Sequence, residues 1–166
     1  MGNLTSKVIW GTADEPADLN VSVTLTADAT LPDYATTGAA AMDLHAAERV
    51  ELVYETPTLV DTGVSVELPY FLCGQVQDQP GLALKKNIRV HADIVDCDYR
   101  ATIKVLMTQT KSTHDDDALS HVVQKGDPIA QLLLLPVARP GLVIVDSLPT
   151  TERGSSQVAV AIAADT

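Results

Sequence analysis

The sequence predicts a single all-β domain, a sandwich or barrel of many short strands. Apolar and polar residues alternate with a period of two along several segments, and Gly and Pro fall between those segments. No segment carries a clear amphipathic helical stripe, which leaves strands separated by turns as the main pattern. With 166 residues, 46% of them hydrophobic, the chain is long enough to bury one core without a metal or a disulfide.

The expected strands follow one another along the chain. Alternation predicts half-buried strands around residues 20–26, 64–68, 88–94 and 158–162. Continuous apolar runs predict two short strands buried on both faces, at residues 132–135 and 142–145. Residues 39–47 have a helix-favouring composition, but no apolar stripe continues it, so no helix of three turns is expected there.

Three parts are expected along the chain. Residues 1–19 are polar and predict an N-terminal extension or arm, residues 20–150 form the β domain, and residues 151–166 form a C-terminal arm. The opening residues also fit the short pattern for N-myristoylation of Gly2. The N-terminus lacks a basic segment followed by a continuous apolar one, so no secretory signal is evident and a cytoplasmic or virion location is expected.

The charge balance excludes some partners. The formal net charge of −11 repels phosphate backbones and so argues against a nucleic-acid polymer as ligand. No apolar run approaches the roughly 20 residues of a membrane span, so no membrane partner is expected. The two cysteines, Cys73 and Cys97, are interpreted as free thiols, although a single bridge between them stays open.

Four blocks of polar and small residues occur in order along the chain. They read Tyr-Ala-Thr-Thr-Gly-Ala-Ala-Ala-Met-Asp-Leu at 34–44, Gly-Leu-Ala-Leu-Lys at 81–85, Ile-Val-Asp-Cys-Asp-Tyr-Arg at 94–100 and Gly-Asp-Pro-Ile-Ala-Gln-Leu at 126–132. In order and spacing these blocks resemble the motifs of the trimeric dUTPase family. The resemblance extends over roughly residues 21–155, and the third block is the most specific of the four.

The resemblance implies a dUTPase-like distorted jelly roll or β-barrel, assembled as a homotrimer with an exchanged C-terminal strand. It implies two catalytic residues. Asp96 matches the carboxylate that orients or deprotonates the attacking water, and Arg153 matches the start of the family's fifth motif.

The resemblance also implies substrate and metal contacts. Tyr99 matches the aromatic ring that stacks on the deoxyribose. Gln131, Gly81 and Lys85 match substrate-binding positions, with Gln131 at the phosphate end. Asp43 matches the acid associated with hydrated Mg²⁺, the cofactor expected if the protein is active.

Several departures fall on the groups that address phosphate. Gln79 and Pro80 stand where the family has Arg-Ser, and proline supplies neither a hydroxyl nor an N–H group. Asp93 replaces a glycine of the third motif, and its orientation matters for the space left to the base. Residues 156–162 lack the phenylalanine and the glycines of the fifth motif and alternate like a strand.

These departures predict that catalysis is weak or lost. The protein would then be a structural or interaction module, such as a trimer on a virion surface with a viral capsid protein as partner. The alternative is an active, divergent dUTPase that hydrolyses dUTP to dUMP and diphosphate with Mg²⁺. A third hypothesis is a nucleotide sensor that binds without hydrolysis. No acid in a suitable context supports the related dCTP deaminase activity.

Overall fold

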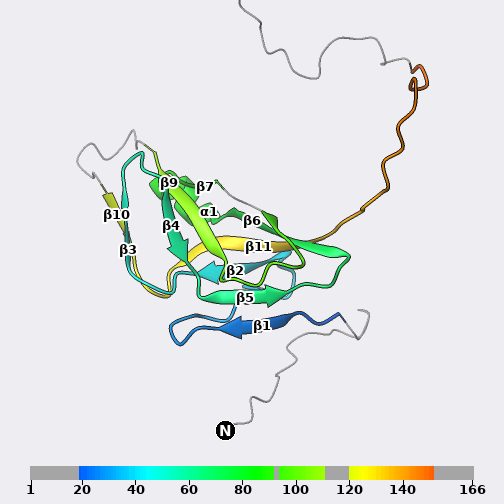
Figure 1. Ribbon diagram of the computed structural model, residues 1–166. Helices are drawn as coiled ribbons and strands as arrows, with labels where there is room; N and C mark the ends of the chain where they lie inside the picture. Colours follow the sequence, from blue (N-terminus) through cyan, green and yellow to red (C-terminus); the bar gives the residue numbers. More distant parts are fainter. Residues whose placement is uncertain (1–18, 92–93, 111–119, 152–166) are drawn as a thin grey trace, which may run out of the picture.

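The computed structural model describes residues 19–91, 94–110 and 120–151, and strands dominate this part of the chain (Figure 1). The expected strand at 158–162 lies outside the described residues, as do Gly2, Asp93 and Arg153. Within the described ranges, no helix is both long and apolar enough to cross a membrane.

The described part of the chain contains eleven strands and one short helix. In chain order they are β1 (Ser22–Leu25), β2 (Ala41–His45), β3 (Val50–Val53), β4 (Thr58–Asp61), β5 (Val64–Glu67), β6 (Leu72–Asp78), α1 (Pro80–Lys86), β7 (Ile88–Val90), β8 (Ile94–Val95), β9 (Lys104–Gln109), β10 (Ser120–Val123) and β11 (Pro128–Pro136). The all-β prediction is therefore confirmed.

The strands pair into two main antiparallel sheets and two ribbons. One sheet has the order β2-β11-β6-β8 and the other the order β4-β9-β7, while β1 pairs with β5 and β3 with β10. Val76 and Leu132 of the first sheet share one buried cluster with Val105 and Met107 of the second. The sheets thus face each other across a common core, as in a β-sandwich.

Most expected strands are present, but burial differs from the prediction at several of them. Alternation at 64–68 is confirmed, because Val64 and Val66 are buried. The first strand is also present as β1, yet its residues are all exposed, so its half-buried assignment is wrong for this chain. In place of one strand at 88–94, the described residues form β7 at Ile88–Val90 and β8 at Ile94–Val95. The helix-favouring composition at 39–47 is overridden, and β2 forms there.

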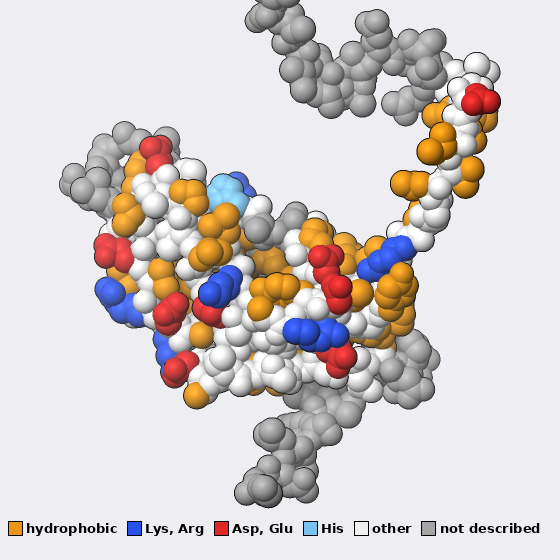
Figure 2. Space-filling view, in the orientation of Figure 1, with side chains coloured by type: hydrophobic (Ala, Val, Ile, Leu, Met, Phe, Trp, Pro, Cys, Tyr) orange, Lys and Arg blue, Asp and Glu red, His pale blue; other side chains and the backbone are white. Residues whose placement is uncertain are grey.

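The strand predicted at residues 142–145 is also wrong. The apolar run at 142–145 is not a strand buried on both faces: the segment runs away from the sheets without regular structure, and Leu142 and Ile144 are 96% and 100% exposed. Figure 2 shows its hydrophobic side chains strung along this segment, clear of the sheets. An apolar run of this kind needs a covering surface, which the described residues of a single copy do not supply.

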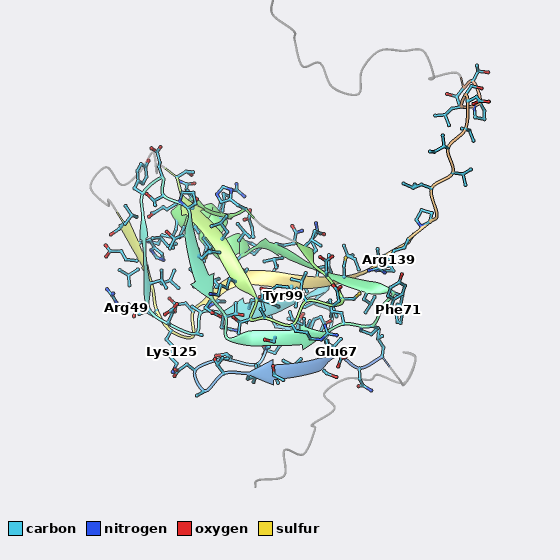
Figure 3. All side chains as sticks on the ribbon, viewed as in Figure 1. Arg49, Glu67, Phe71, Tyr99, Lys125 and Arg139 are labelled. Atoms are coloured by element: carbon cyan, nitrogen blue, oxygen red, sulfur yellow. The ribbon has the colours of Figure 1, made fainter. Side chains whose placement is uncertain are left out.

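The base of this segment is fastened to the tip of the β5–β6 connection. The backbone N–H of Val137 donates to the carbonyl oxygen of Phe71 at 2.9 Å. The Arg139 guanidinium stacks 4.4 Å from the centroid of the Tyr70 ring and donates to the carbonyl oxygen of Tyr70. Phe71 and Arg139 lie together at one end of the molecule in Figure 3. The segment therefore leaves the body from a fixed point.

Candidate active site

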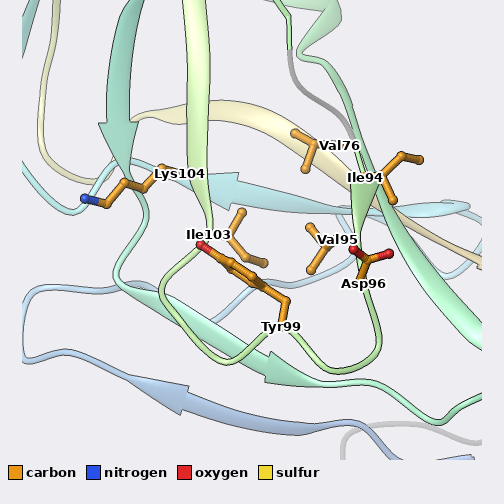
Figure 4. Close-up of a pocket in the computed structure, with 7 residues that line it drawn as sticks. All are labelled: Val76, Ile94, Val95, Asp96, Tyr99, Ile103 and Lys104. Carbon is orange, nitrogen blue, oxygen red and sulfur yellow. The ribbon is translucent and has the colours of Figure 1, made fainter.

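A pocket opens between β8 and the start of β9. Its volume is about 200 Å³, and it is lined by Val76, Ile94, Val95, Asp96, Tyr99, Ile103 and Lys104. Figure 4 shows the Asp96 carboxylate and the Tyr99 ring on either side of Val95. The structure thus brings together two residues that the third motif singled out, around a largely apolar floor.

The turn that carries both residues is closed by its own hydrogen bonds. The Tyr99 N–H donates to the carbonyl oxygen of Asp96 at 3.1 Å, and the Tyr99 hydroxyl donates to the carbonyl oxygen of Thr102 at 3.1 Å. The Arg100 guanidinium donates to the carbonyl oxygens of Cys97 and Tyr99 at 2.8 and 3.0 Å. These bonds fix the backbone of the turn and hold the Tyr99 ring by its hydroxyl.

Gly74 permits the strand contact beneath this turn. Gly74 pairs with Val95 in the β6–β8 register. A Cβ at position 74 would lie 2.9 Å from Cδ1 of Leu132 and 3.2 Å from Cβ of Val95, both closer than ordinary packing allows. A glycine at position 74 is thus needed for close packing under the pocket.

Asp61 supports the far wall of the pocket. Its carboxylate accepts hydrogen bonds from the Gly63 N–H at 2.7 Å and the Thr102 hydroxyl at 3.1 Å, and it lies 3.7 Å from the Lys104 ammonium. The motif comparison does not single out this residue. An Asp two residues before a Gly is a typical turn signal, and Gly63 has φ +66°, so the Asp-Thr-Gly run was the available sequence clue.

A second cluster forms around Asp43 on β2. Its Oδ1 atom accepts a hydrogen bond from Nε2 of Gln131 at 3.0 Å and another from Nε2 of Gln79 at 3.2 Å. Asp43 and Gln131 are also register partners in the β2–β11 pair. The structure therefore joins three motifs in one polar cluster, including Gln79, which the sequence comparison marked as a departure.

The remaining predicted site residues lie apart from these two groups. Gly81 is exposed near the start of α1, and a Cβ there would meet nothing within 4 Å. Lys85 is exposed in the last turn of the same helix. Pro80 occupies the first turn of α1, where it lacks the N–H group of other residues. Within one copy of the chain, neither Gly81 nor Lys85 lines the pocket.

The family model described as dUTPase matches residues 27–160. The chain belongs to the dUTPase family. Among curated proteins, the deoxyuridine 5′-triphosphate nucleotidohydrolase of Hydrogenobaculum sp. is 36% identical over 130 residues, covering 76% of this chain and 85% of the relative. The corresponding protein of Paramecium bursaria Chlorella virus 1 is 35% identical over 130 residues, covering 78% and 88%.

Solved dUTPase structures share the fold. The Staphylococcus bacteriophage 80alpha dUTPase, solved with dUpNHpp, gives a TM-score of 0.74 at 22% identity, covering 84% of this chain and 96% of that one. A mutant dUTPase from the S. aureus phage phi11 gives a TM-score of 0.70 at 20% identity, covering 77% and 97%. The dUTPase-like fold expected from the motifs is confirmed.

The comparisons bear unequally on the two main hypotheses. The curated relatives above are named as nucleotidohydrolases of deoxyuridine triphosphate, which favours the active-enzyme alternative. The predicted loss of catalysis, the structural-module role and the viral capsid partner find no support in them.

Proposed function

We propose that this protein is a dUTP diphosphatase that hydrolyses dUTP to dUMP and diphosphate with Mg²⁺. The observation that carries the proposal is the pocket that sets the Asp96 carboxylate opposite the Tyr99 ring in a member of this family. The largely apolar floor suits a nucleoside, and the carboxylate at the rim suits an attacking water.

Tyr99 and Asp96 have different roles in the proposed reaction. Tyr99 offers one face of its ring as a surface against which a deoxyribose packs, and a 2′-hydroxyl would be crowded there. Asp96 is exposed at the pocket edge, so its carboxylate accepts a proton from, or orients, a water held within hydrogen-bond distance. General-base action of this type contributes about 10²–10⁴-fold to a rate.

We expect Mg²⁺ to be held by one carboxylate of the protein together with the phosphates of the substrate. In the described ranges, no three His, Cys, Asp or Glu side chains gather as a ligand group, so these ranges of one copy offer no metal cage. Mg²⁺ is commonly held by one or two carboxylates together with substrate phosphates and water. Asp43 is the carboxylate we assign to that role, and the ion supplies charge neutralisation as diphosphate leaves.

The two groups of site residues imply that a second copy completes the site. Following the strand registers, Asp43 and Asp96 lie three strands apart and about four residues out of step, a separation on the order of 20 Å. A water must be within hydrogen-bond reach of both its base and the phosphorus it attacks. Asp96 of one copy and Asp43 of another therefore serve one nucleotide in our proposal.

Such an assembly also accounts for the exposed segment at 137–151. A homotrimer in which each C-terminal segment crosses to a neighbour would cover Leu142 and Ile144, which one copy leaves almost fully exposed. In this scheme residues 1–19 and 151–166 are arms outside the β domain at 20–150. Arg153 then reaches the neighbour's nucleotide.

The test is diphosphate release from dUTP by purified protein, run beside Asp96→Asn. We expect saturable turnover by the unmodified protein and a loss of at least about 100-fold in kcat for the variant. Asp98→Asn is the matched control, since Asp98 is exposed on the same turn but does not line the pocket. Equal rates for the unmodified protein and Asp96→Asn would reject the proposal.

Pro80 is the observation that supports the structural-module hypothesis. Losing one preorganised donor costs about 10²–10³ in rate, and proline lacks both the hydroxyl and the N–H group. The same assay separates the two functions. A correctly folded trimer with no diphosphate release at any dUTP concentration would favour the module.

A further inference from the structure

The amide groups around Asp43 have a defined orientation. An ionised carboxylate has only acceptor atoms, so Gln79 and Gln131 must each turn an NH₂ group toward it. Both hydrogen bonds end on Oδ1 of Asp43, at 3.2 and 3.0 Å. One N–H of each amide is therefore committed to Asp43, and both amide oxygens face away from it.

The backbone on either side of Gln79 is held firmly. The Asp78 carboxylate accepts a hydrogen bond from the Val90 N–H at 2.7 Å and pairs with Arg89 at 2.7 Å. Pro80 fixes its own φ on the other side. Gln79 is also the N-cap residue of α1, yet its side chain makes no capping hydrogen bond and instead reaches Asp43. The Gln79 side chain is thus bonded to Asp43 and not to the helix terminus.

The charge of this cluster follows from the residue types. Across the ranges that the structure describes, no Lys, Arg or His lies within ion-pair distance of Asp43. An arginine at position 79 would balance the carboxylate, whereas an amide leaves its negative charge in place. Within the described part of one copy, the negative charge of the Asp43 carboxylate is therefore not balanced by a cation at ion-pair distance, and the two side chains bonded to it are neutral donors.

We propose that Gln79 is a positioning residue that makes nucleotide binding at this wall conditional on a divalent cation. The Gln79 amide orients the Asp43 carboxylate as a guanidinium would, but the amide does not neutralise the negative charge of that carboxylate. Mg²⁺ that arrives with the phosphates must therefore neutralise it. This inference rests on the proposed function, because it takes Asp43 and Gln131 as the phosphate end of a dUTP site.

Calorimetric titration with dUpNHpp, in Mg²⁺ and in EDTA, tests the inference. We expect removal of Mg²⁺ to weaken binding to the unmodified protein by about tenfold or more, the size of one uncompensated charge near the surface. Gln79→Arg should bind the analogue in EDTA about tenfold more tightly than the unmodified protein does, and Mg²⁺ should then add threefold or less, by about the same estimate.

Gln77→Arg is the matched control. Gln77 is exposed on β6, two residues before Gln79, and is the register partner of Gln131, but its side chain has no hydrogen bond to Asp43. We expect this variant to keep the strong Mg²⁺ dependence of the unmodified protein. If Gln77→Arg reproduces Gln79→Arg, position 79 has no special role and the inference is overturned. An unchanged Mg²⁺ dependence in Gln79→Arg overturns it as well.

Two further readouts keep this result separate from the proposed function. Asp43→Asn removes the negative charge itself, whereas Gln79→Arg balances it. Asp43→Asn should therefore also lessen the Mg²⁺ dependence of nucleotide binding, and it should shift the side-chain NH₂ resonances of Gln131 in NMR spectra. Turnover of dUTP with unaltered Mg²⁺ dependence in Gln79→Arg rejects only the inference. Mg²⁺-dependent binding without turnover rejects only the proposed function. Absence of binding in both buffers rejects both.

Discussion

The turn at residues 96–102 and the turn at residues 78–81 carry the two halves of the candidate site, and they differ in what they retain. The first keeps the expected carboxylate and aromatic ring, closed by hydrogen bonds within the turn. The second exchanges a charged donor and a hydroxyl for Gln79 and Pro80, yet Gln79 still bonds to Asp43. A pocket for a nucleoside depends on shape, whereas charge at a phosphate site can be supplied by an ion that arrives with the ligand.

Among the variants that compare the two turns, replacement of Tyr99 should have the largest effect. Tyr99→Ala removes the ring that faces the sugar. We expect KM for dUTP to rise about 10–100-fold, taking for the sugar the energy of about 1–3 kcal/mol that stacking of a base on an aromatic ring contributes. Tyr99→Phe keeps the ring and loses only the hydrogen bond to Thr102, so KM should change less than about tenfold. Equal KM values for the two variants would contradict a stacking role.

Gly74→Ala should destabilise the fold at the support of the first turn. The added methyl group would overlap Leu132 and Val95, and overpacking of this kind typically costs about 1–3 kcal/mol. Gly81→Ala is the control in the second turn, where a methyl group meets nothing within 4 Å. Urea unfolding measures both. Equal loss of stability in the two variants would contradict the tighter packing that we assign to the first turn.

Asp78→Ala probes how firmly the second turn is held. It removes two charge-assisted hydrogen bonds, to Val90 and Arg89, and because Asp78 is partly exposed we expect a loss of about 1.5 kcal/mol in unfolding free energy. Arg89→Met removes only the exposed ion pair and should cost less than about 0.5 kcal/mol. If Arg89→Met proved as costly as Asp78→Ala, the ion pair and not the backbone bond would hold the turn.

The smallest effect is expected from replacement of His121 in the β3–β10 ribbon, which carries neither turn. Burial lowers the pKa of His121, the Lys86 ammonium lowers it further, and Asp127 opposes both. A lowered pKa in the folded state means that protonation favours unfolding. The contribution of His121 to stability is therefore complete above about pH 6.5 and is lost as the pH falls through its folded-state value. His121→Gln should reduce the drop in urea midpoint between about pH 7 and about pH 5.5, and an unchanged drop would contradict this assignment.

Sequence reasoning predicted the fold class well because period-two alternation reports burial within one chain. Val64 and Val66 are both buried as that rule requires. The same rule failed for β1 and for residues 142–145, whose apolar side chains are exposed in a single copy. Periodicity records that a side chain is to be covered, but it does not say by which copy of the chain.

The site was predictable where a motif carries the chemistry. The third motif marked Asp96 and Tyr99, and both line one pocket, while the roles assigned to them stay predictions. The first and fourth motifs marked Asp43 and Gln131, but the hydrogen bond between them was not predicted. Asp61 was missed because its role depends on contacts with Thr102 and Lys104, more than 40 residues away in the chain. Gln79 was interpreted as a loss, since its hydrogen bond to Asp43 is visible only in three dimensions.

The most direct test of the central claim is the rate of diphosphate release from dUTP, UTP and dCTP by the purified full-length protein in Mg²⁺. The account predicts saturable release from dUTP, with kcat/KM at least about tenfold above the values for the other two nucleotides. It expects UTP to be disfavoured by its 2′-hydroxyl at the Tyr99 ring. Release from dUTP no faster than in the absence of protein would contradict it.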